Sequence, residues 1–169
     1  MGESLLLITI ITLVVLTIRR AKPVVLENPV IIQRPGQYHI TLAPQLNRAQ
    51  TFIEQIARQF TQAHPLQGDL PTQYFEVRDP KVFSRGESAY LLAIALRGGV
   101  LYFQAVNPKP LLHDADSHYK TVREFSESVL LHHPFTAPAD ERGPEKLRAA
   151  VDTIAGQFQI AVKALQTGD

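Results

Sequence analysis

The sequence predicts an α+β fold in which an N-terminal single transmembrane helix precedes an antiparallel five-stranded sheet with helices mainly on one face. Three observations support this fold class. A long uncharged apolar run lies near the N-terminus, two hairpin patterns follow, and a segment between the hairpins has the apolar periodicity of a helix. We expect residues 1–22 to form the membrane anchor and residues 23–169 to form one soluble domain.

The predicted membrane segment runs from Leu5 to Ile18 and contains no charged residue. Fourteen helical residues span about 21 Å, and the preceding residues together with snorkelling Arg19 and Arg20 extend this towards the roughly 30 Å of a bilayer core. In a cleaved signal peptide the positive charge comes before the apolar run, whereas here Arg19, Arg20 and Lys22 follow it. The positive-inside rule therefore predicts a single-pass protein with a cytoplasmic domain, and a periplasmic domain is the alternative.

The first hairpin pattern lies in Val30 to Leu42, where Pro35-Gly36 separates two short stretches. The second stretch alternates apolar and polar residues, which is the period of a half-buried strand. Farther along the chain, Tyr74 to Arg78 is predicted as another strand region.

The second hairpin pattern is more pronounced. Gly98-Gly99 supplies the positive φ angles of a two-residue turn between Ala89 to Leu96 and Val100 to Val106. The strand before the turn is almost wholly apolar, which predicts a central strand covered on both faces.

Two helices are predicted between and after these strands. Leu46 to Ala63 carries one apolar stripe at spacings of three and four, and Pro44 suits its first turn. A shorter helix is expected over about Ser117 to Leu131, where Thr121 and Glu124 have the spacing of a capping box.

The last predicted helix opens within residues 140–144 and closes at Gly168. Its apolar residues recur at alternating spacings of four and three, which is the heptad seam of a helix that packs on another helix. The seam can face a protein partner or cover the domain's own sheet, and both alternatives stay open here. The candidate partner-binding residues are Leu147, Val151, Ile154, Phe158, Ala161 and Leu165.

The element order after the membrane helix is therefore β-β-α-β-β-β-α-α. This order resembles that of the longin and profilin-like families of adaptor and sensor domains. The resemblance covers topology alone and rests on no motif, so it implies no function and no site residue.

One segment, His113 to His118, is dense in metal-ligating side chains. His113, Asp116 and His118 could hold a divalent ion, given the oxygen and nitrogen ligands that such ions prefer. The spacing matches no metal motif, and Asp116 or Ser117 can instead cap the helix that follows. We expect no cofactor, and we expect these side chains to cap the helix or to be solvated.

The composition and the absence of known motifs argue against several classes of function. A formal net charge of +1, with no basic cluster beyond the anchor, argues against a nucleic-acid partner, and the absence of cysteine excludes disulfides and thiolate metal sites. The sequence has no phosphate-binding Gly-Lys-Ser/Thr loop and no HExxH motif. The prediction is a non-enzymatic accessory or structural subunit that is anchored in the lipid bilayer and binds other protein subunits of a larger membrane complex. The alternative is a metal-dependent enzyme, or a metal or ligand sensor, that uses the His113–His118 cluster.

Overall fold

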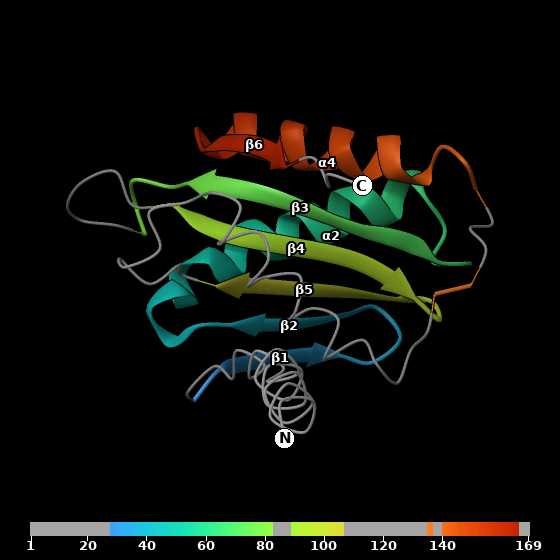
Figure 1. The fold of residues 1–169 in the computed structure, drawn as a ribbon, viewed down its shortest axis with the longest axis horizontal. Helices are drawn as coiled ribbons and strands as arrows, with labels where there is room; N and C mark the ends of the chain where they lie inside the picture. The colour runs from blue at the N-terminus through green and yellow to red at the C-terminus, as the bar shows by residue number, and fades with distance from the viewer. Residues whose placement is uncertain (1–27, 83–88, 107–134, 137–139, 166–169) are drawn as a thin grey trace, which may run out of the picture.

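The computed structural model describes residues 28–82, 89–106, 135–136 and 140–165 (Figure 1). The predicted membrane segment from Leu5 to Ile18, the predicted helix over residues 117–131 and the His113–His118 cluster lie outside these residues. Within the ranges just given, no helix is long and apolar enough to cross a membrane.

Six strands form one sheet in the order β1-β2-β5-β4-β3-β6 (Figure 1). All neighbouring strands pair antiparallel except β2 and β5, which run parallel. The strands are β1 Val30–Arg34, β2 Tyr38–Leu42, β3 Leu70–Arg78, β4 Tyr90–Arg97, β5 Val100–Val106 and β6 Ala161–Leu165.

The α+β class is confirmed, but the predicted antiparallel five-stranded sheet is wrong in two respects. The first hairpin joins the rest of the sheet through β2, which makes a parallel pair with β5, so the sheet is mixed. The second difference is β6, a sixth strand formed by residues that were predicted to continue the last helix. The strand pairs β2–β5 and β3–β6 both join segments that are far apart in the sequence.

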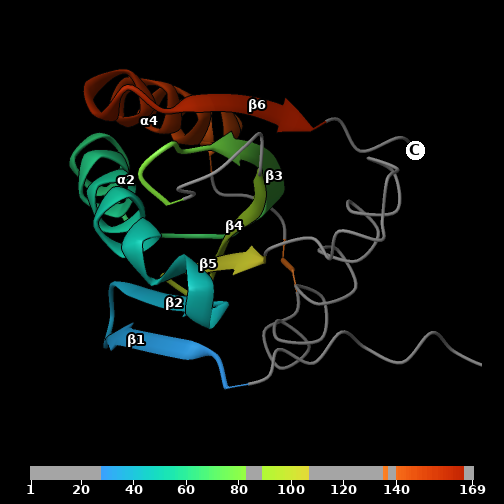
Figure 2. The same cartoon turned by 90° about the vertical axis from the view of Figure 1, so that its left-hand side faces the viewer.

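Two α-helices occur in the described part of the chain, α2 Gln50–Ala63 and α4 Gly143–Phe158, and a 3₁₀-helix, η1 Pro44–Ala49, leads into α2. The helix predicted over residues 46–63 is thus confirmed, with its beginning wound as 3₁₀. Both α-helices lie side by side on one face of the sheet (Figure 2).

The last helix ends at Phe158 because Gln159 adopts a left-handed conformation with φ 56° and ψ 42°. The Ile160 N–H then reaches back to the carbonyl oxygen of Ala155 at 2.9 Å, which is the closure of a Schellman motif. The chain reverses and pairs with β3, so that Val162 and Ala164 pack against the core. The prediction that the helix extends to the region of Gly168 is therefore wrong.

The main core lies between the sheet and the two helices, and every residue of β4 is buried. Since β4 lies between β3 and β5, the predicted central strand is confirmed. A smaller cluster of buried residues lies on the opposite face of the sheet and consists of Tyr74, Leu91, Ala93 and Val106.

The β4–β5 turn has a backbone conformation that favours glycine. Gly98 and Gly99 have φ angles of 56° and 77°, as the predicted two-residue turn requires, and a Cβ on Gly99 would lie 3.1 Å from the carbonyl oxygen of Leu66. We expect Gly99→Val to lower the free energy of unfolding by about 1–3 kcal/mol. Chemical denaturation of the full-length protein in mild detergent measures this change. Gly36→Val is the matched control, because Gly36 has φ 71° and open space around it; an equal loss in both variants would show that the Leu66 contact adds nothing.

Candidate functional site

The two edges of the sheet, β1 and β6, are the places where another strand could be added. In β1, Val30 and Ile32 pack against the core, whereas Ile31 points to the opposite face and is 56% exposed. Three consecutive β-branched residues favour the extended conformation, and the alternation follows from the two-residue period of a strand. The edge strand β1 therefore presents an apolar side chain to solvent.

The two edges differ in charge. β6 carries the exposed Lys163 at its centre, and a lysine on an edge strand is a common protection against unwanted strand pairing. In β1 the only charged residue is Arg34, at the end of the strand, and Val30 to Gln33 carry no charge. Of the two edges, β1 is therefore the less protected one.

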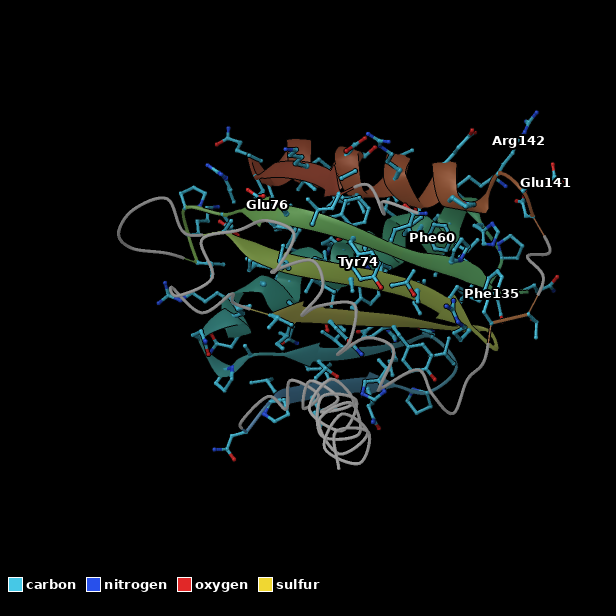
Figure 3. The ribbon with its side chains drawn as sticks, viewed as in Figure 1. Phe60, Tyr74, Glu76, Phe135, Glu141 and Arg142 are labelled. Carbon is cyan, nitrogen blue, oxygen red and sulfur yellow. The ribbon has the colours of Figure 1, made fainter. Side chains whose placement is uncertain are left out.

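The other large apolar side chain that is strongly exposed among the described residues is Phe135, at 48%. It lies beside the end of the sheet that carries the β4–β5 turn (Figure 3). Its ring lies over the Arg97 guanidinium, with 5.0 Å between the ring centroid and Cζ, which is the distance of a cation–π contact. Phe135 thus has a structural partner in this chain.

A buried carboxylate, Asp69, holds the same end of the sheet together. It accepts hydrogen bonds from the Gly98 N–H at 3.0 Å, from the Thr136 N–H at 2.8 Å and from the Thr136 hydroxyl at 2.9 Å. Burial alone would raise the pKa of Asp69, but these hydrogen bonds and the nearby Arg97 charge hold the pKa below its ordinary value. The ionised Asp69 carboxylate therefore links residues 135–136 to the β4–β5 turn through hydrogen bonds, and we call this arrangement the Asp69 clamp.

Arg97 is also almost fully buried, and its guanidinium donates hydrogen bonds to other residues of this chain. The guanidinium donates to the carbonyl oxygens of Leu70 and Leu96, and more weakly to the Thr72 hydroxyl at 3.4 Å. Desolvation lowers the pKa of Arg97 from its ordinary value, and the carboxylate of Asp69 opposes that change. Arginine stays charged at neutral pH all the same. These contacts indicate a structural network, because the charged groups are already paired.

A histidine–carboxylate pair lies near the start of α4. His64 is buried and stacks on Phe60 with 4.9 Å between ring centroids, and its Nδ1 lies 3.4 Å from Oδ2 of Asp140. Asp140 also accepts hydrogen bonds at 2.8 Å from Lys146 Nζ and from the Arg142 N–H, which together hold its pKa below the ordinary value. The second ring nitrogen of His64, Nε2, is buried too. The pair therefore offers no nitrogen to a substrate and is not arranged for general-base catalysis.

Among the hollows on the described surface, two are considered as candidate binding places. One, of about 350 Å³, lies beside Gln73 and Arg148 at the part of β3 next to the end of β6. The other, of about 500 Å³, is lined by Arg48, Thr51, Phe52, Asp79, Lys81 and Phe158. Both are open and mix charged with apolar side chains, and neither contains a set of groups with a recognisable chemical role.

The predicted partner-binding seam is divided between two elements. Leu147, Val151 and Ile154 are buried in the core of this chain, and Phe158 packs edge-on against Phe52 with 5.8 Å between centroids. Ala161 and Leu165 belong to β6 and not to a helix. A spacing of four residues, as between Ala161 and Leu165, also suits a strand, in which every second residue lies on the same face. The spacing therefore did not distinguish a helix from a strand here.

The other predicted site residues lie outside the described part of the chain. These are Leu5, Ile18, Arg19 and Arg20 of the anchor and His113, Asp116 and His118 of the metal alternative. Within the described ranges, no group of three or more His, Cys, Asp or Glu side chains is placed to hold a metal ion.

The β1 edge was not predicted as a site. The uncharged Val30–Gln33 stretch was visible in the sequence, but which strand of the hairpin forms the edge depends on the parallel pairing of β2 with β5. Comparison of the chain with protein-family models, curated proteins and solved structures gives no match.

Proposed function

We propose that this chain is a single-pass, membrane-anchored accessory or structural subunit whose α+β domain binds a protein partner within a larger membrane assembly. The observation that carries the proposal is the uncharged run from Leu5 to Ile18 followed at once by Arg19, Arg20 and Lys22. Such a run suits the bilayer interior, and the basic residues suit the interface.

The described domain supports a binding role more than a catalytic one. Its buried charged groups, such as Asp69 and Arg97, bond to this chain. The His64–Asp140 pair, which lies in the described part of the chain, has both imidazole nitrogens buried. Among the strands that the structure describes, none pairs with the outer side of β1, and Ile31 is exposed there; both features are used in binding by strand addition. We assign a protein–protein contact to this edge.

The edge is also close to the proposed anchor along the chain. Seven residues, 23–29, separate Lys22 from Val30, and a chain of that length spans at most about 25 Å. A partner bound at β1 would therefore lie close to the membrane surface, which is where other subunits of a membrane assembly are found.

Orientation gives a direct test of the anchor. With Arg19, Arg20 and Lys22 on the cytoplasmic side, we expect a green fluorescent reporter fused after Asp169 to be fluorescent and an alkaline phosphatase reporter at that position to be inactive. Replacing the three basic residues with glutamine should weaken this preference. An active phosphatase fusion in the wild-type chain would contradict the orientation, and recovery of the full chain in the soluble fraction would contradict the anchor itself.

A further inference from the structure

We infer that the strand that pairs with β1 is β1 of a second copy of this chain, so that two domains join their sheets edge to edge. The inference rests on the proposed function, because a shared membrane brings the two edges together. Its starting observation is Ile31, which is 56% exposed on an edge strand whose other isoleucine packs on the core.

The sequence of β1 is self-complementary. Two identical edge strands related by a two-fold axis run antiparallel, and residues directly opposite each other point to the same face of the joined sheet. An axis through Ile31 places this side chain against its own copy, and it places Val30 against the partner subunit's Ile32. All these pairs consist of β-branched apolar side chains, which pack well across strands.

The charges of β1 are compatible with this pairing. Val30 to Gln33 carry no charge, so no like charges face each other in the centre of the contact. Arg34 would lie opposite Asn28 of the partner subunit, an uncharged residue just before the strand. In β6, by contrast, a two-fold axis through the central residue would place the exposed Lys163 against its own copy. The chemistry of the two edges therefore favours β1.

The contact is small. A five-residue strand contributes less surface than the roughly 1,200–2,000 Å² that stable complexes of soluble proteins bury. Two chains anchored in one membrane in the same direction meet at a much higher effective concentration than free domains do. The pairing should therefore be tested with the full chain in its membrane.

Cysteine cross-linking measures the pairing directly, because the chain has no cysteine of its own. Opposite residues of antiparallel strands have Cα atoms about 4.5–5.5 Å apart, which suits a disulfide. Ile31→Cys should therefore give a band at twice the chain mass when membranes are oxidised. Gln33→Cys is the matched control, since it is exposed on the same face of β1 but lies about 13 Å along the strand from its copy. Lys163→Cys probes the other edge.

The expected result is a double-mass band for Ile31→Cys and no such band for Gln33→Cys or Lys163→Cys. A second readout uses two differently tagged copies: Ile31→Lys should lose co-purification of the second copy, and Ile31→Val should keep it. Equal bands for Ile31→Cys and Gln33→Cys would overturn the inference. No band for Ile31→Cys in chains that still belong to a larger assembly would overturn it too and leave the proposed function standing. Recovery of the chain as a soluble monomer would instead remove the proposed function, and the inference with it.

Discussion

Leu92→Ala is expected to lower the free energy of unfolding by about 2–5 kcal/mol, because the lost burial is accompanied by a cavity that the core cannot close. Leu92 lies in the central strand β4, opposite Phe75 of β3 and Ala105 of β5, and it is 0% exposed. Chemical denaturation of the full-length protein in mild detergent, followed by circular dichroism, measures the change.

Arg58→Ala is the control for this measurement, since Arg58 is exposed on α2 and its truncation leaves the core intact. We expect this variant to stay within about 0.5 kcal/mol of the wild-type free energy of unfolding. Unfolding of Leu92→Ala at the wild-type denaturant concentration would show that β4 is not at the centre of the core.

Asp69→Ala is expected to cost about 3 kcal/mol near neutral pH, because it removes three charge-assisted hydrogen bonds and leaves buried Arg97 without its nearby carboxylate. Asp152→Ala, at an exposed position of α4, is the matched control and should leave stability nearly unchanged. A similar loss of stability in both variants would mean that the hydrogen bonds of Asp69 do not stabilise the fold specifically.

The same residue predicts a pH dependence with a definite sign. The folded-state pKa of Asp69 lies below its ordinary value of 3.8. The contribution of Asp69 to stability is therefore fully present above that ordinary value and is lost as the pH falls through the lower folded-state pKa. Below pH 4 the wild type should lose stability more steeply than Asp69→Ala, and parallel acid-unfolding curves for the two proteins would contradict the assignment.

Elements specified by local sequence were predictable. The β4–β5 hairpin follows from Gly98-Gly99, whose φ angles of 56° and 77° are the ones that the two-residue turn needs. The apolar stripe of α2 likewise indicated a helix with one buried face. In both cases a few neighbouring residues determine the backbone and the buried side.

The end of α4 and the strand order could not be predicted from local sequence patterns. Gln159 ends α4 in the left-handed conformation that a glycine usually supplies, so the sequence showed no stop signal there. The parallel pairing of β2 with β5 joins segments about 60 residues apart, and it decides that β1 is an edge. The candidate site could not be predicted for the same reason, because the sequence does not show that Ile31 lies on an edge strand until the strand order is known.

If the anchored chain is a subunit of a larger membrane assembly, its native complex contains other subunits. The measurement is native mass spectrometry of the tagged full-length chain, expressed at its natural level and purified in mild detergent. We expect a complex in which this chain and at least one different membrane-associated subunit occur in a fixed ratio. Recovery of the chain only as a monomer, or only as a dimer of itself, would show that it is not a subunit of such an assembly.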